Sequence, residues 1–282
     1  MGILEDLRKS GFLFNRGLGQ NFILDEGFLD SVVRDLGLEK SDTVVEVGTG
    51  AGTLTRVLAR TARQVITFEI DKRLEPILTK QFDGIQNITL IFNDALKLTE
   101  SEITNLIPAD KSAWKLVANL PYYITTPLIM KFLSHPNCTE ISVLVQKELG
   151  QRIIAKPGTS DYGALSVAVQ AAARAKIIRH APRHLFTPQP KVDSVFVQIK
   201  KRPDTENTAS DCLGGETFEA LLKGIFAARR KTMENALALA TGLKKDDAAR
   251  ILDTLGIKAT LRPEQITVEE YIRLAHFVSK NV

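Results

Sequence analysis

The residues best suited to chemistry are Asn119-Leu120-Pro121-Tyr122, which follow a strand-like run at residues 115–118. Pro121 fixes its own φ and biases Leu120 towards an extended backbone, so this loop should be stiff. The amide carbonyl of Asn119 can accept hydrogen bonds, and the ring of Tyr122 can stack on a flat ring. Together they could hold a planar substrate by its exocyclic amino group. A structural proline turn with a buried tyrosine is the competing interpretation.

The elements that would position this loop begin with a predicted buried strand at residues 43–47. A turn, Gly48-Thr49-Gly50-Ala51-Gly52, and a predicted helix at residues 53–60 follow it. Strand, glycine-rich turn and helix open a nucleotide-binding Rossmann unit. Glu69 ends the next predicted strand, about 20 residues past the first glycine, where a carboxylate can accept hydrogen bonds from ribose hydroxyls.

The pattern of strand and helix then repeats. A predicted strand at residues 88–92 ends in Asn93-Asp94-Ala95. Asp94 could accept a hydrogen bond from an adenine amino group, with a helix or turn cap as the alternative. Ligands of open α/β sheets bind beyond the carboxyl ends of the strands, and Gly48, Glu69, Asp94 and Asn119 all follow such ends. The sequence therefore predicts an α/β, Rossmann-like domain with these residues at one site.

Charge is distributed unevenly along the chain. The net charge is +4, but residues 146–202 contain 11 Lys and Arg against 3 Asp and Glu, a net +8. A basic band of this kind suits a nucleic-acid phosphate backbone, and a merely solvated surface is the alternative. The candidate RNA contacts in this band are Lys176, Arg179, Arg183 and Lys191.

A proline-containing loop lies within the basic band. Pro188 and Pro190 should stiffen it and present Phe186 as an exposed aromatic, with Lys191 close behind. An exposed ring beside cations is what a stacked base and its phosphate would use, although Phe186 as ordinary core is the alternative. Further along, the Arg229-Arg230 pair is either an RNA contact or a solvated turn.

The domain organisation predicted from the chain is a catalytic domain at residues 1–200 and a small helical domain at residues 201–282. Residues 201–215 are polar and predict a linker, and the pattern is helical from residue 217 onward. Only two cysteines occur, outside any Cys-x-x-Cys pattern, which favours a reducing compartment and predicts no metal site. Because the sequence shows no membrane span and no signal peptide, we expect a cytoplasmic protein.

These motifs resemble a known family, the ribosomal-RNA adenine dimethyltransferases that use S-adenosylmethionine, and the likeness covers nearly the whole chain. The motifs that match are Gly19-Gln20-Asn21-Phe22, Glu46-Val47-Gly48-Thr49-Gly50-Ala51-Gly52, Phe68-Glu69-Ile70-Asp71, Asn93-Asp94-Ala95, Asn119-Leu120-Pro121-Tyr122 and Phe186-Thr187-Pro188-x-Pro190-Lys191-Val192-x-Ser194. The tail, Phe226-Ala227-Ala228-Arg229-Arg230-Lys231-Thr232 with Leu261-Arg262-Pro263-Glu264, resembles the bacterial small-subunit branch. Thr49 stands where the family usually has Pro, and Tyr123 where many relatives have Asn.

The resemblance implies a Rossmann-like methyltransferase that dimethylates two adjacent adenosines near the 3′ end of small-subunit ribosomal RNA, on the free RNA or an assembly intermediate. We expect a monomer. The implied cofactor contacts are Asn21, Ile23, Gly48, Gly50, Glu69, Asp94, Ala95 and Asn119. The implied catalytic group is Asn119, Leu120, Pro121, Tyr122 and Phe186.

The mechanistic hypothesis is that the Asn119 side-chain carbonyl and the Leu120 backbone carbonyl accept hydrogen bonds from the adenine amine, while Tyr122 and Phe186 sandwich the unstacked base. Three alternatives stay open. The first is an enzyme that modifies one adenine of large-subunit RNA. The second is a non-catalytic RNA-binding or ribosome-assembly factor on the same scaffold. The third is a nucleotide-dependent dehydrogenase, which fits the glycine turn and Glu69 but leaves Asn119–Tyr122 and the basic band unexplained.

Overall fold

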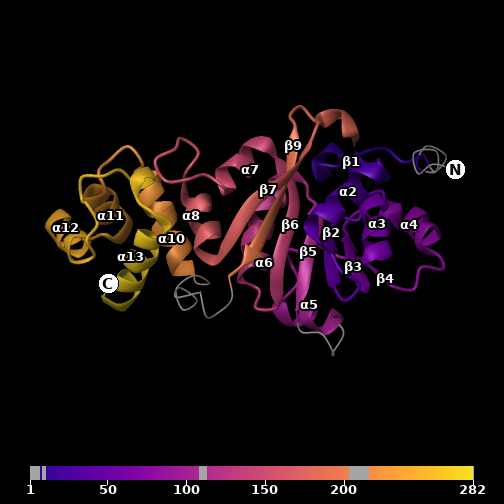
Figure 1. Cartoon of the computed structure of the whole chain (residues 1–282), viewed down its shortest axis with the longest axis horizontal. Helices are drawn as coiled ribbons and strands as arrows, with labels where there is room; N and C mark the ends of the chain where they lie inside the picture. Colours follow the sequence, from indigo (N-terminus) through magenta and orange to yellow (C-terminus); the bar gives the residue numbers. More distant parts are fainter. Residues whose placement is uncertain (1–6, 8–10, 108–112, 203–215, 282) are drawn as a thin grey trace. The chain divides into compact units, whose positions relative to one another are not determined.

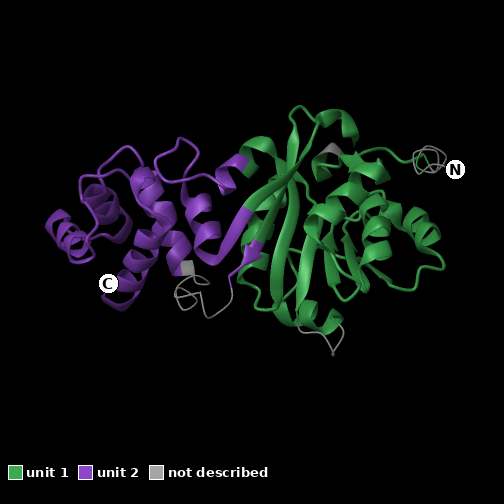
Figure 2. Cartoon of the chain, viewed as in Figure 1, with its two compact units in different colours: residues 1–150, 176–199 green, residues 151–175, 200–282 purple. Residues whose placement is uncertain are grey.

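The structure is a computed structural model that describes residues 7, 11–107, 113–202 and 216–281. It divides into two compact units (Figure 2). Unit 1 comprises residues 1–150 and 176–199, and unit 2 comprises residues 151–175 and 200–282. The predicted boundary at residue 200 places residues 151–175 with the catalytic domain, whereas in the structure they group with the C-terminal helices. Most of the predicted linker, residues 203–215, lies outside the described residues.

The described part of the chain forms a seven-stranded sheet with the order β4-β3-β2-β5-β6-β9-β7 (Figure 1). Its strands are β2 (Thr43–Val47), β3 (Gln64–Glu69), β4 (Ile88–Phe92), β5 (Trp114–Asn119), β6 (Cys138–Gln146), β7 (Ala173–Ala181) and β9 (Ser194–Lys201). Strands β2 to β6 pair in parallel with their neighbours. The predicted Rossmann-like α/β fold is confirmed, and β9 and β7 extend one edge of the sheet beyond β6.

Every residue of β2 is buried, so this strand is covered on both faces. On one face, α2 (Glu26–Leu36) and α3 (Thr53–Thr61) share a core cluster with residues of β2, β3 and β5, among them Val44, Val65 and Val117. Helix α2 begins and ends as its sequence predicts. Asp25 accepts a hydrogen bond from the amide of Phe28, and Gly37 ends the helix in the left-handed region.

Helix α4 (Glu75–Phe82) follows a short 3₁₀ turn, η2 (Lys72–Leu74). Pro76, which has no amide proton, fits the first turn of α4 and separates it from η2. Helix α5 (Glu100–Leu106) was not predicted, because only Ile103 of its seven residues is buried and no apolar period shows. Helix α6 (Thr125–Ser134) packs on β5 through an edge contact between Phe132 and Trp114.

A segment before α2 carries the short strand β1 (Phe22–Ile23), which pairs antiparallel with β8 (Phe186–Thr187). We call residues 11–24 the N-terminal arm. Its Phe12 and Phe14 rings pack on Phe22 at centroid distances of 6.3 and 5.4 Å. The arm is therefore fixed both by strand pairing and by aromatic packing.

Unit 2 consists mainly of helices, with the first residues of β7 and the last residues of β9. The helices are α8 (Ala164–Ala172), α10 (Glu216–Ala227), α11 (Met233–Thr241), α12 (Lys245–Thr254) and α13 (Val268–Asn281), together with the end of α7 (Lys147–Ile153). A row of aromatic rings joins residues 151–175 to the later helices, because Tyr162 contacts Phe226 and Phe226 contacts Tyr271. The last helix begins with a capping box between Thr267 and Glu270.

Candidate cofactor and substrate site

The sheet reverses its strand order between β2 and β5, and this position brings the glycine turn to the Asn119 corner. From β2 the chain runs outward to β4 and returns to pair β5 with the other side of β2. Gly48, at the end of β2, has φ +82, and a Cβ there would lie 3.5 Å from the carbonyl oxygen of Asn119. Such a reversal is where open α/β sheets bind ligands.

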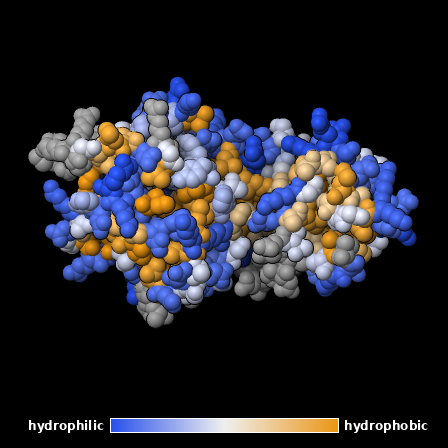
Figure 3. Space-filling view, turned by 180° about the vertical axis from the view of Figure 1, so that it is seen from behind, coloured by the Kyte–Doolittle hydropathy of each residue, from blue (hydrophilic) through white to orange (hydrophobic). Residues whose placement is uncertain are grey.

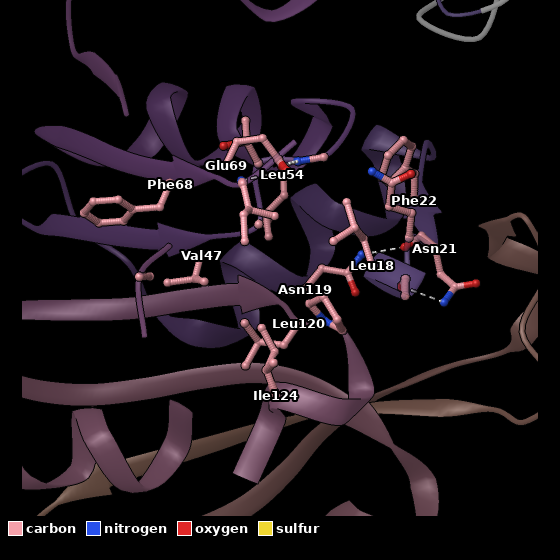
Figure 4. Close-up of a pocket in the computed structure, with 18 of the residues that line it drawn as sticks. Leu18, Asn21, Phe22, Val47, Leu54, Phe68, Glu69, Asn119, Leu120 and Ile124 are labelled. Carbon is pink, nitrogen blue, oxygen red and sulfur yellow. Dashed lines mark hydrogen bonds between the residues drawn. The ribbon is translucent and has the colours of Figure 1, made fainter. Parts of the chain in front are cut away.

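A cavity of about 220 Å³ opens at this position. Figure 4 shows Glu69, Asn119 and Asn21 around it. All eight predicted cofactor contacts line the cavity, and so do four of the five predicted catalytic residues: Asn21, Ile23, Gly48, Gly50, Glu69, Asp94, Ala95, Asn119, Leu120, Pro121 and Tyr122. The glycine turn and the Asn-Leu-Pro-Tyr corner thus share one space, which their roles in a single reaction require.

Glu69 is held by backbone amides on both of its oxygens. Oε2 accepts from the amide of Gly50 at 2.8 Å, and Oε1 accepts from Ile70 and Asp71 at 3.0 and 2.8 Å. Burial raises the pKa of this carboxyl, and the three amide hydrogen bonds oppose that shift. The carboxylate is therefore oriented by the glycine turn itself.

A second buried carboxyl, Glu46, lies beneath the turn. Its Oε2 accepts from the hydroxyls of Thr55 and Thr67 at 2.6 and 2.7 Å, and Thr67 lies 2.7 Å from the hydroxyl of Thr49. Burial raises the pKa of Glu46 to about 8. The two hydrogen bonds oppose this shift, and the charge of Glu69 adds to it. Thr49, one of the two residues that depart from the family pattern, thereby gives the turn a side-chain anchor.

The amide of Asn119 is oriented by the N-terminal arm. Its Nδ2 donates to the backbone carbonyl of Asn21 at 3.0 Å, drawn as a dashed line in Figure 4. This bond engages the donor end of the amide. The acceptor end, Oδ1, is the atom that remains for a substrate amine.

The two aromatic residues predicted to sandwich a base lie in different environments. Tyr122 lines the cavity, and its hydroxyl is 2.9 Å from the hydroxyl of Ser194. The expectation of an exposed Phe186 is wrong, since this side chain is only 4% exposed and belongs to the core cluster under α2 and α3. Strand pairing of β8 with β1 turns Phe186 inward, opposite Ile23.

The loop after β4 is fixed by a lysine that the sequence did not indicate. The ammonium of Lys131, on α6, donates to the carbonyls of Ala95 and Leu96 at 3.0 and 2.7 Å and also to that of Leu98. Burial lowers its pKa, opposed by the charges of Asp94 and Glu102. Asp94 also caps its own turn by accepting from the amide of Leu96, so the turn-cap interpretation of this residue is confirmed.

We call residues 176–191 the basic segment. Lys176, Arg183 and Lys191 are exposed, as RNA contacts should be. Arg179 instead donates to Asp35 of α2 at 2.6 Å, so its charge is already paired. The backbone amide of Arg183 is fixed by the carboxylate of Asp193, at 3.0 Å.

The two arginines between α10 and α11 also differ. Arg229 donates to the carbonyl of Ser160 at 2.8 Å and lies 3.6 Å from the carboxylate of Glu264. Its guanidinium therefore ties together three segments of unit 2. Arg230 is exposed, and the turn predicted as one interpretation of this pair is present.

Sequence reasoning singled out only some of the apolar residues of the cavity wall. This wall includes Leu18, Phe22, Leu54, Phe68, Ile70, Tyr123 and Ile124, of which Leu18, Leu54 and Ile124 lie outside the residues that the sequence analysis singled out. Phe22, Phe68 and Ile70 belong to the quoted motifs, which was a usable signal, but nothing in the sequence placed Ile124, the residue before α6, there.

Among the described residues, no helix is both long and apolar enough to cross a membrane. In the same part of the chain, no three His, Cys, Asp or Glu side chains are grouped as ligands for a metal ion.

The sheet with a cavity at its strand reversal defines a Rossmann-like fold, and the family described next makes the protein a methyltransferase dependent on S-adenosylmethionine. The family model for ribosomal RNA adenine dimethylase matches residues 11–280. The chain belongs to this family, and it is accordingly an enzyme that dimethylates adenine in ribosomal RNA.

Individual relatives agree with this membership. The chain is 40% identical to ribosomal RNA small subunit methyltransferase A of Enterococcus faecalis, over 98% of this chain and 94% of the relative. It is 39% identical to the protein of the same name from Clostridioides difficile, over 99% and 95%. A crystal structure of a dimethyladenosine transferase from Plasmodium falciparum matches with a TM-score of 0.74 and 26% identity, covering 90% of this chain and 96% of that one. The 23S rRNA methyltransferase ErmE matches with a TM-score of 0.65 and 26% identity, covering 91% and 100%.

Proposed function

We propose that this protein dimethylates two adjacent adenosines near the 3′ end of small-subunit ribosomal RNA during ribosome biogenesis, acting as a cytoplasmic monomer. The observation that carries the proposal is the shared cavity, in which the Asn119 corner faces the glycine turn within one chain. The near full-length likeness to relatives named small subunit methyltransferase A supports the choice of RNA.

The cavity suits S-adenosylmethionine in its donors and acceptors. Glu69 would accept from the ribose hydroxyls and Asp94 from the adenine amine, while Gly48 and Gly50 would let the backbone approach the ligand. Asn21, Ile23 and Ala95 would complete the wall. When bound, this cofactor supplies an electrophilic methyl group on a positively charged sulfur.

The protein's part in the transfer is positioning. An adenine amine is a weak nucleophile because its lone pair is delocalised into the ring. Oδ1 of Asn119 and the carbonyl of Leu120 would accept its two hydrogens, favouring a pyramidal nitrogen with an available lone pair. Pro121 keeps these acceptors in place, and in-line displacement then depends on orientation and requires no strong base.

Tyr122 would lie against the unstacked target base. Ser194 holds the ring through its hydroxyl, so the stacking face is fixed before the RNA arrives. Phe186 is buried and would support β1 and the arm from beneath. Its contribution would be indirect.

Primer extension tests the proposal, because two methyl groups on an adenine amine block base pairing and stop reverse transcriptase. Ribosomal RNA from cells that lack the protein should lose two adjacent stops near the 3′ end of the small-subunit RNA. The wild-type gene should restore both stops, and the Asn119→Ala gene should restore neither. Unchanged stops in the deletion strain would refute the proposed substrate.

A second candidate is methylation of large-subunit RNA, which the structural likeness to the 23S rRNA methyltransferase favours. Purified, unmethylated small and large subunits, each incubated with labelled S-adenosylmethionine, separate the two. We expect label in the small subunit, and label confined to the large subunit would establish the second candidate.

A further inference from the structure

Two neighbouring tyrosines line the cavity, and they differ sharply in exposure. Both belong to the 3₁₀ turn η3 (Tyr122–Ile124), which follows Pro121. Tyr122 is partly buried and bonded to Ser194. Tyr123 is 61% exposed although it also lines the cavity. Its ring therefore lies at the cavity mouth and faces solvent.

Large exposed hydrophobic side chains among the described residues are Leu13, Ile70, Tyr123, Val192 and Leu239. Tyr123 is the aromatic one of these. Figure 3 shows hydrophobic and hydrophilic residues interspersed over the face that it draws. Because Tyr123 is exposed and lines the cavity, its ring offers at the entrance to the reaction site the flat surface that a nucleobase needs for stacking.

The backbone under Tyr123 is rigid. The carbonyl of Pro121 accepts from the amide of Ile124 and from the hydroxyl of Thr125, each at 3.1 Å. Gly19 of the arm has φ +62, and a Cβ there would come within 3.1 Å of Pro121 and 3.6 Å of the Tyr123 ring. Because the glycine lets the arm approach so closely, the ring rests against the arm on one side and is open on the other.

A target adenine must leave its stack to reach Asn119, and an aromatic side chain that stacks on RNA offsets part of that cost. The residue that the sequence suggested for this purpose, Phe186, is buried. We propose that Tyr123 stacks on the nucleobase next to the target adenine, at the mouth of the cavity. The inference rests on the proposed function. In that function the target adenine occupies the interior of the cavity beside Asn119, so the next nucleobase stays outside, at the mouth where Tyr123 lies.

The role predicts a particular pattern of kinetic effects. Tyr123→Ala should raise KM for the RNA substrate about tenfold, the size expected for one lost base–aromatic contact. Tyr123→Phe keeps the stacking face and should stay within twofold of wild type. Neither change should alter the affinity for S-adenosylmethionine by more than about twofold, because Tyr123 lies at the mouth, away from Glu69 and Asp94.

The experiment uses the full-length protein with unmethylated small subunits and labelled S-adenosylmethionine. Leu13→Ala is the matched control, since Leu13 is 76% exposed but does not line the cavity. Calorimetric titration with S-adenosylmethionine verifies that each variant is folded. A wild-type KM in Tyr123→Ala would overturn the inference, and so would a Tyr123→Phe variant as impaired as the alanine variant.

Failure of the proposed function gives a different result, because wild-type protein would then leave the small subunit unlabelled. In that case the same variants are compared on the large subunit. The inference survives there if Tyr123→Ala alone raises KM, and it is overturned if all the proteins behave alike.

Discussion

The cavity and the basic segment are both made of polar side chains, but they differ in how those side chains are held. In the cavity, each amide, carboxylate and hydroxyl described above has a partner within the protein that sets its direction, as Asn21 does for Asn119. In the basic segment, Lys176, Arg183 and Lys191 are exposed, and the one contact described for their cationic groups is a long hydrogen bond of 3.4 Å from Arg183 to the carbonyl of Lys191. The first region suits a reaction that requires fixed geometry, and the second suits a phosphate backbone that can be met in many ways.

Asn119→Ala is the strongest test of a fixed cavity. The change removes both the acceptor for the amine and the bond to Asn21, so kcat should fall more than about 100-fold. RNA binding should remain within about twofold, because the basic segment is untouched. Methyl transfer from labelled cofactor gives kcat, and filter binding gives the RNA affinity. A kcat within about threefold of wild type would remove Asn119 from the mechanism.

Lys131→Met tests whether the cavity depends on residues outside its lining. The methionine cannot donate to the carbonyls of Ala95, Leu96 and Leu98, so the loop that carries Asp94 should loosen. We expect about tenfold weaker binding of S-adenosylmethionine in calorimetric titration, with partial recovery in Lys131→Arg. Lys80→Met, on the exposed face of α4, is the control. Equal affinities in Lys131→Met and the control would mean that the loop keeps its shape unaided.

The same contrast explains how much the sequence could predict. The strands and the residues at their ends followed from local patterns, and the 43–47 and 88–92 strands have the predicted bounds. Parallel strands end at one edge, so Gly48, Glu69, Asp94 and Asn119 could be brought together without a structure.

What could not be predicted depends on contacts distant in sequence. The burial of Phe186 results from the pairing of β8 with β1, more than 160 residues earlier in the chain. The pairing of Arg179 with Asp35 and the capture of three carbonyls by Lys131 are of the same kind. No local pattern reveals which cation is already paired. A basic band can therefore be predicted from composition, whereas its available charges cannot.

Single alanine variants in the basic segment test that difference between cations. Lys176→Ala, Arg183→Ala and Lys191→Ala should each weaken RNA binding about threefold and reduce the slope of log affinity against log salt by about 0.7 to 0.9. Arg179→Ala should change the slope less, because its charge is paired with Asp35, but it should lower the melting temperature. Filter binding between 50 and 300 mM KCl, roughly, measures the slopes. If Arg179→Ala shifts the slope as much as the other three, the ion pair opens when RNA binds.

Glu46→Gln should leave activity at pH 7 within about twofold and alter only the dependence of stability on pH. The folded protein raises the pKa of Glu46 from about 4.5 to about 8 through burial, so between these values the folded state keeps a proton that the unfolded chain releases. The free energy of unfolding should then fall as pH rises across this window, by up to about 1.4 kcal/mol per unit. Glutamine keeps an acceptor for Thr55 and Thr67 but cannot ionise.

Thermal melts at several pH values between 5 and 9, roughly spanning the window set by the two pKa values, measure this difference. Wild type and Glu46→Gln should melt at similar temperatures near pH 5. As the pH rises to about 8, the melting temperature of the variant should exceed that of wild type by a growing difference. Glu69, whose pKa is also raised by burial, remains in both proteins, so the comparison isolates Glu46 together with its interaction with the charge of Glu69. Glu75→Gln, at an exposed position of α4, is the control and should melt in parallel with wild type. Parallel curves for Glu46→Gln as well would mean that Glu46 is ionised beneath the turn, held by Thr55 and Thr67 alone.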